Sequence, residues 1–91
     1  MRLDLYLKIT RLIPRRSLAQ EFCDAGRISV NGTPAKSSKE VKAGDEIQIN
    51  RRGRSTKLAV VQVPGTKQVS KALSSELYKI LEETVHDDGL I

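Results

Sequence analysis

Apolar residues recur at a spacing compatible with a helix near the start of the chain, where Leu3, Leu7 and Leu12 alternate with polar positions. This pattern predicts a first helix over residues 3–12. Proline disfavours helical geometry in the residue before it, so Pro14 indicates that the helix ends near Leu12.

A second helix is expected from Ser17. Ser17 and Gln20 have the spacing of a capping box, in which the two side chains satisfy backbone N–H groups at a helix start. Gly26 stands where a left-handed C-terminal cap is expected. The apolar residues between these signals are Leu18, Ala19, Phe22 and Cys23.

The next segment alternates in the manner of β-strands. Ile28–Val30 is followed by Asn31-Gly32, the dipeptide that best suits a type I′ hairpin turn. Pro34 makes the returning strand short or places it at a sheet edge. Further strands are expected at 46–49 and 58–63, with a turn at 51–54 between them.

The last third of the chain has helical spacing again. Its apolar positions predict a C-terminal helix over residues 68–83, with Pro64 and Gly65 ending the segment before it. The pattern therefore predicts an α+β fold: two N-terminal helices on a small, mostly antiparallel sheet, plus a C-terminal helix. We expect a domain at 1–64 and a helical extension and tail at 65–91. That helix is expected to pack on its own domain, with docking to a protein partner as the alternative.

Composition narrows the kind of partner. Ninety-one residues with 38% hydrophobic content allow one small domain with a thin core. The net charge is +5, and it is uneven: residues 1–57 carry 13 Lys/Arg against 6 Asp/Glu, whereas residues 58–91 carry 3 against 5. Because the basic residues gather at turns and helix starts, they favour a nucleic acid over a membrane surface. Without a bilayer-length apolar run or a signal-peptide core after Met1, a cytoplasmic protein is expected.

The arginines beside the predicted helix starts are the leading candidates for binding phosphate. Arg15 and Arg16 precede the Ser17 cap, where a helix start favours anions and two guanidiniums can bind a phosphate in bidentate fashion. Arg2 precedes the first helix in the same way. Arg16 is expected to be exposed and to contribute little to folding. The predicted RNA-binding residues are Arg2, Lys8, Arg11, Arg15, Arg16, Lys36 and Lys39.

Other charged residues have two interpretations. Asp4 is expected to be structural, favouring the helix dipole and orienting a nearby arginine. Lys36 and Lys39 either extend the phosphate-binding face or form a solvated loop. The turn with Arg51, Arg52 and Arg54 either contributes positive potential or is a solvated surface turn.

Enzymatic function is not expected. Cys23 lies on the apolar pattern of the second helix, and His86 is the only histidine. The chain has no nucleophile–base pair, no phosphate-binding glycine loop and no metal-ligand spacing. We therefore expect no catalytic residue, no metal and no cofactor.

Four motifs in order resemble the S4 RNA-binding domain family: RLDxxL at Arg2–Leu7, RRSLA at Arg15–Ala19, GRISVNG at Gly26–Gly32 and VKAGDEIQI at Val41–Ile49. The resemblance covers about half the chain and implies binding to folded RNA. Enzymes that carry this module attach it to a large catalytic domain, and the rest of this chain is too short to be one.

The start RLDxYLKxxRLI, the following RRSLA and the acidic C-terminal end are similar to the RqcP family of stand-alone S4 proteins. This resemblance implies binding to 23S rRNA and peptidyl-tRNA on stalled large (50S) ribosomal subunits, where the P-site tRNA is stabilised. It also implies a partner like RqcH, which adds C-terminal alanines to the nascent chain. Arg2 and Arg16 match the family's RNA contacts, and off the ribosome a monomer is expected.

Two other functions stay open. The chain is also similar to the fifteen-kilodalton heat-shock protein, which implies recycling of 50S subunits. A helix–turn–helix DNA-binding protein is the alternative from another class. Its recognition helix would read bases, yet the second helix here offers Gln20, Glu21 and Asp24, two of which are acidic.

Overall fold

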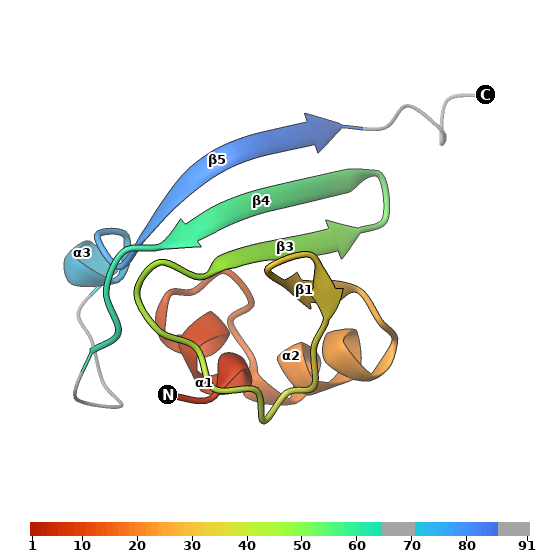
Figure 1. The fold of residues 1–91 in the computed structure, drawn as a ribbon, viewed down its shortest axis with the longest axis horizontal. Helices are drawn as coiled ribbons and strands as arrows, with labels where there is room; N and C mark the ends of the chain where they lie inside the picture. The colour runs from red at the N-terminus through yellow and green to blue at the C-terminus, as the bar shows by residue number, and fades with distance from the viewer. Residues whose placement is uncertain (65–70, 86–91) are drawn as a thin grey trace.

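The computed structural model describes residues 1–64 and 71–85 and confirms the α+β fold (Figure 1). Its strands form a five-stranded antiparallel sheet in the order β2-β1-β3-β4-β5. The elements are α1 (Leu3–Ile9), α2 (Arg16–Asp24), β1 (Ile28–Val30), β2 (Thr33–Pro34), β3 (Glu46–Arg51), β4 (Arg54–Val60), α3 (Lys71–Ser74) and β5 (Tyr78–Val85).

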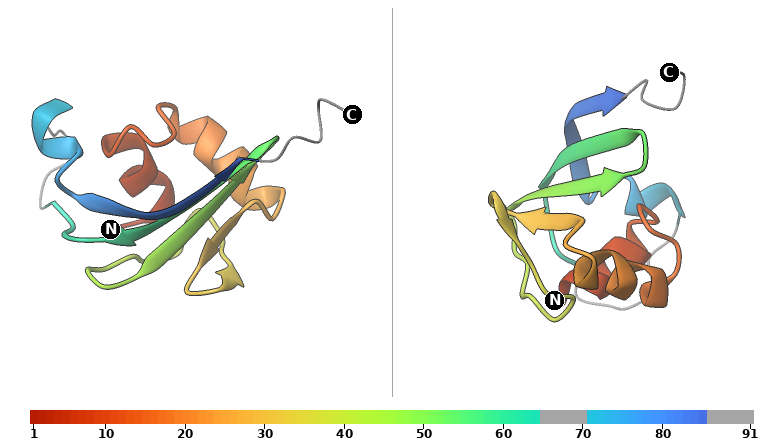
Figure 2. Two further views of the ribbon diagram at one scale, coloured as in Figure 1. Left: turned by 90° about the horizontal axis from the view of Figure 1, so that it is seen from above. Right: turned by 90° about the vertical axis from the view of Figure 1, so that its right-hand side faces the viewer.

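Helices α1 and α2 lie on one face of the sheet (Figure 2). The core fills the space between these two layers, and alternate residues of β3 and β4 point into it. Burial of this apolar surface is the main stabilising term, as expected for a domain of this size. Its fully buried side chains include Leu3, Tyr6, Leu7, Ile28, Ile47, Ile49 and Leu58. None of the helices in the described part of the chain is long and apolar enough to cross a membrane.

The predicted hairpin turn is confirmed. Asn31 and Gly32 have φ of 53° and 84°, and a type I′ turn needs this left-handed conformation at both positions. Pro34 ends β2, which is a two-residue strand at the edge of the sheet, as predicted. Gly26 follows α2 with φ of 72°, so it is the expected left-handed residue after a helix.

Both N-terminal helices form, but their predicted limits shift. Helix α1 ends at Ile9 rather than near Leu12, because Arg11 adopts a left-handed φ of 62° that a helix cannot continue through. Helix α2 starts one residue before Ser17, with Arg15 as its cap residue and no side-chain cap hydrogen bond. The predicted capping box is therefore wrong.

The predicted C-terminal helix is wrong over most of the segment that the structure describes. Only Lys71–Ser74 is helical, and Tyr78–Val85 forms β5; residues 68–70 of the predicted helix lie outside the described residues. The reason is not local: β5 pairs with the outer edge of β4, whose backbone N–H and C=O groups would otherwise face water unpaired. The division at residue 64 stays a prediction, although β5 belongs to the common sheet.

The start of β5 is fixed by three hydrogen bonds to one carbonyl. The Leu77 oxygen accepts the Tyr6 hydroxyl at 2.7 Å, the Val61 N–H at 2.9 Å and the Gln62 N–H at 3.2 Å. Tyr6 is fully buried, and this burial raises the pKa of its hydroxyl. The C-terminal segment is thus attached to α1 as well as to β4.

Candidate RNA-binding surface

One buried carboxylate organises the start of α1. The Asp4 side chain is fully buried, and its Oδ2 accepts hydrogen bonds from Arg16 Nε at 3.1 Å and Gln20 Nε2 at 2.9 Å. Arg2 meets both carboxylate oxygens at 3.3 Å, and the Leu5 N–H donates to Oδ1 at 2.8 Å. We call Asp4, Arg2, Arg16 and Gln20 the Asp4 cluster.

The carboxyl of Asp4 is ionised in this setting. Burial by itself would raise the pKa of Asp4, but the hydrogen bonds from Gln20 and Arg16, together with the positive charge of Arg16, outweigh it and hold that pKa below its usual range. A buried carboxylate is tolerated only when it is paired and hydrogen-bonded in this way. With two arginines against one carboxylate, the Asp4 cluster keeps a net positive charge.

The two arginines are oriented by Asp4 yet reach solvent. The Arg2 side chain is 47% exposed and that of Arg16 is 38% exposed. Arg16 meets Asp4 through Nε alone, so this ion pair leaves both terminal nitrogens for a second anion. A guanidinium that is already held in place loses less side-chain entropy when it binds a phosphate. The arrangement therefore suits recognition of an RNA backbone.

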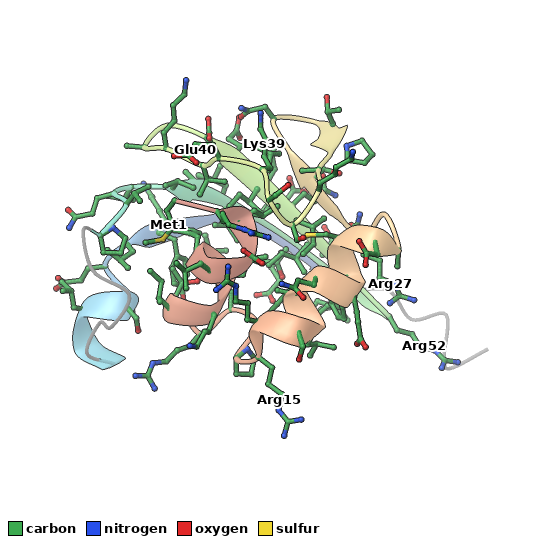
Figure 3. The ribbon with its side chains drawn as sticks, turned by 90° about the horizontal axis from the view of Figure 1, so that it is seen from below. Met1, Arg15, Arg27, Lys39, Glu40 and Arg52 are labelled. Atoms are coloured by element: carbon green, nitrogen blue, oxygen red, sulfur yellow. The ribbon has the colours of Figure 1, made fainter. Side chains whose placement is uncertain are left out.

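A basic loop lies directly beside this cluster. The Leu3 N–H donates to the Lys39 carbonyl at 2.8 Å, and the Asp4 N–H donates to the Ser37 carbonyl at 3.1 Å. A β-bridge also joins Arg2 to Glu40, whose carboxylate lies 2.8 Å from the N-terminal amine. Figure 3 shows Lys39 and Glu40 on this loop. Tertiary contacts thus bring the loop with Lys36 and Lys39, both exposed, next to the start of α1.

The other predicted residues lie around this centre rather than in it. Arg15 is exposed at the start of α2 and points away from the body of the protein (Figure 3). Lys8 and Arg11 are exposed near the opposite end of α1, about 10 Å along the helix from Arg2. The structure therefore joins Arg2 and Arg16 through Asp4, and it leaves Arg15, Lys8 and Arg11 as separate positive charges.

Two features differ from the sequence-based interpretation. Arg16 is half-buried against Asp4, not fully exposed, so it also supports the fold. The sequence pattern predicts Gln20 in a helix cap, yet its amide donates to Asp4. The spacing offers a signal for this role: Arg16 and Gln20 are four residues apart and share one face of α2, the face that meets α1.

The arginines near the β3–β4 turn have partners within the fold. The Arg51 guanidinium donates to the Leu12 carbonyl, and Arg54 lies 3.2 Å from the Glu83 carboxylate. Arg52 is exposed at the tip of the turn, far from Arg15 in Figure 3. Arg27 lies over the Phe22 ring at 5.8 Å from its centroid.

The described residues do not assemble a metal-binding group. No set of three His, Cys, Asp or Glu side chains in this part of the chain comes close enough to hold a metal ion. Cys23 is buried, and burial followed by the charges of Asp4 and Asp24 raises the pKa of its thiol to about 11. That thiol is protonated at neutral pH and is not an activated nucleophile.

Two short helices on an antiparallel sheet, with arginines held at the helix starts, define an RNA-binding module of the S4 type. Residues 1–47 match the family model described as the S4 domain. The chain is 50% identical over 84 residues to the RQC P-site tRNA stabilizing factor of Bacillus subtilis, covering 91% of this chain and 94% of that one. It is 46% identical to the Streptococcus pneumoniae protein of the same name, covering 92% of this chain and 93% of that one. The chain therefore belongs to the S4 domain family and, within it, to the RQC P-site tRNA stabilizing factors.

Two solved structures have the same fold. The trimeric structure of Vibrio cholerae heat shock protein 15 is similar with a TM-score of 0.80 and 26% identity, covering 89% of this chain and 81% of that one. The solution structure of the hypothetical protein HP1423 is similar with a TM-score of 0.79 and 34% identity, covering 90% of this chain and 98% of that one.

Proposed function

We propose that this protein is a non-catalytic, cytoplasmic RNA-binding factor of ribosome-associated quality control. In this proposal it binds 23S rRNA and peptidyl-tRNA on stalled 50S subunits and stabilises the tRNA in the P site. The observation that carries the proposal is the Asp4 cluster, where one buried carboxylate presents Arg2 and Arg16 at the surface. The name shared by relatives that match almost the full chain supplies the ribosomal context.

The chemistry of the cluster suits holding an RNA rather than changing it. Phosphate contacts supply affinity and orientation through charge, and oriented guanidiniums add bidentate geometry. Lys36 and Lys39 extend the positive surface from the adjoining loop, while Lys8, Arg11 and Arg15 add charge around it. A small protein with these groups can stabilise one arrangement of a bound tRNA without a reacting side chain.

The proposed partner protein is an RqcH-like factor that adds C-terminal alanines to the nascent chain while the tRNA is held. This role requires no catalysis by the present chain. We propose that it is a monomer when it is not bound to the ribosome.

A heat-shock-type role in recycling 50S subunits is the second candidate, and the fold similarity to heat shock protein 15 favours it. That similarity comes with 26% identity, against 50% for the Bacillus subtilis quality-control factor. The helix–turn–helix alternative has less support, because the Gln20 amide is bound to Asp4 and cannot read a base. The exposed side chains Glu21 and Asp24 of α2 would repel DNA phosphates.

Co-sedimentation with purified ribosomal particles tests the proposal. The protein should bind 50S subunits that carry peptidyl-tRNA in preference to empty 50S subunits and intact 70S ribosomes. Arg16→Ala should reduce this binding, whereas Arg52→Ala, which removes the same charge from the exposed turn, should change it little. Equal binding to all three particles would leave RNA binding in place but would remove the quality-control role.

A further inference from the structure

A groove lies between the β1–β2 hairpin and the basic loop. It has a volume of about 490 Å³, within the range of roughly 300–1,000 Å³ typical of small-ligand sites. Val30, Pro34 and Ala35 supply its apolar surface, and Lys36 and Lys39 stand among its lining residues. None of the described residues that line it is acidic.

The groove shares its loop with the candidate RNA-binding surface. The loop that carries Lys36 and Lys39 is the one whose Ser37 and Lys39 carbonyls accept the first N–H groups of α1. Those N–H groups belong to Leu3 and Asp4, so the loop that lines the groove is bonded to the helix that carries Asp4. A backbone bound at the arginines can therefore continue past the lysines.

The chemistry of the lining points to one ligand class. An apolar surface beside two exposed lysines matches a molecule with a flat apolar part and an anionic part, which describes a nucleotide. We propose that the groove holds one unpaired nucleotide of the bound RNA, with its base on Pro34 and Ala35 and its phosphate beside Lys36 and Lys39. This inference rests on the proposed RNA binding and adds that the protein contacts the RNA at an unpaired nucleotide.

The groove should accept different bases. The Asn31 amide, the group in the lining best able to read a base edge, donates to Asp45 at 3.2 Å and accepts the Glu46 N–H at 2.9 Å. The remaining polar side chains include only the small hydroxyls of Thr33 and Ser38 beside the lysines. Apolar contact with Pro34 and Ala35 and the shape of the groove would then dominate, and neither depends on hydrogen bonds to a base edge.

Two synthetic RNA duplexes that differ only by one extruded uridine test the inference in a low-salt binding assay. The parent protein should bind the duplex with the extruded uridine about tenfold more tightly than the fully paired duplex, because only the extruded nucleotide reaches the apolar surface and the lysines of the groove. Pro34→Asp places a negative charge in the groove and should abolish this preference while retaining binding to the paired RNA.

Ala43→Asp is the matched control. Ala43 is exposed, does not line the groove, and acquires the same charge, so this variant should keep the preference. If thermal melting shows that Pro34→Asp does not fold, Ser38→Asp in the exposed loop replaces it. Equal affinity of the parent for both RNAs overturns the inference. The inference also fails if the groove variant and Ala43→Asp lower the affinity for both RNAs by the same factor.

A photo-crosslink locates the nucleotide directly. With 4-thiouridine at the extruded position, the crosslinked peptide should contain residues 33–39. A crosslink confined to another part of the chain overturns the groove assignment while RNA binding stands. Absence of binding to either RNA would instead refute RNA binding itself, and with it the proposed function.

Discussion

At the start of α1 two arginines share one buried carboxylate. Near the β3–β4 turn, by contrast, Arg51 binds the Leu12 carbonyl and Arg54 pairs with Glu83. Asp4 is fully buried and Arg2 and Arg16 stay partly exposed beside it. Arg54 instead meets Glu83, and the two side chains are almost equally exposed at 46% and 43%. The Asp4 carboxylate fixes two guanidiniums and leaves an excess of one positive charge. In the exposed Arg54–Glu83 pair the two charges cancel each other.

The difference shows why arginine counts do not locate an RNA site. An exposed ion pair contributes little stability and adopts several geometries, so it neither positions a charge nor leaves one in excess. A buried acceptor constrains its donors, because an unpaired carboxylate inside the protein would be costly. The location of the carboxylate therefore decides which arginines are presented.

Removal of the buried acceptor should have the largest effect. Asp4→Ala should lower the free energy of unfolding by about 2–4 kcal/mol, since Arg2, Arg16, Gln20 and the Leu5 N–H lose their shared partner. RNA affinity should fall about tenfold or more, although the net charge rises by one. Urea unfolding and filter binding measure the two effects.

Glu83→Ala is the matched control for that charge change. It should cost less than about 1 kcal/mol and leave RNA binding equal or slightly stronger, because the Arg54 pair is exposed. If Asp4→Ala bound RNA more tightly, as net charge alone predicts, orientation of the arginines would not matter.

Arg16→Ala should have the next largest effect. It should weaken RNA binding by about 1–3 kcal/mol and lower the salt dependence of binding by about one unit of slope, because one phosphate contact is lost. Stability should fall by about 1–2 kcal/mol, because Asp4 loses a donor.

Arg16→Lys separates charge from geometry. It keeps the positive charge but not the planar guanidinium, so the salt slope should persist while affinity still decreases. Binding of Arg16→Ala equal to that of the parent would place the RNA contact elsewhere on the protein.

The pH dependence of stability isolates the Asp4 carboxylate. Its pKa is lowered by folding, so its contribution is fully present above the unfolded value of about 4 and is lost as pH falls through the lower folded value. The stability difference between the parent and Asp4→Asn should thus be constant near neutral pH and shrink below about pH 4. A difference that disappeared already near pH 6 would mean that another group is titrating.

The smallest effect on stability and RNA affinity is expected for Arg54, near the β3–β4 turn. Arg54→Ala should change the free energy of unfolding by less than about 1 kcal/mol and should reduce RNA affinity less than Arg16→Ala does. Chemical denaturation and binding measured together make this comparison. A loss of RNA affinity as large as that of Arg16→Ala would assign the β3–β4 end to the RNA-binding surface.

The sequence by itself determined the features that depend on neighbouring residues. Asn31-Gly32 specifies a turn through backbone conformations that few other residues adopt, and Gly26 ends α2 for the same reason. The alternation in Ile28–Val30 and Glu46–Ile49 is likewise local, so these two strands and the α+β fold were predictable. The ordered motifs also predicted the S4 family that the comparison of residues 1–47 confirms.

Tertiary structure decided what local pattern leaves open. Leu77, Ile80 and Leu81 are apolar at helical spacing, yet Tyr78–Val85 forms β5 because the exposed edge of β4 offers backbone partners that no local signal reveals. Likewise Arg16 and Gln20 meet Asp4 only because α2 packs against α1. Backbone pairing at a sheet edge and burial of a charge both depend on residues distant in sequence, and for that reason the fold, not the pattern, selects the arginines that Asp4 holds at the surface.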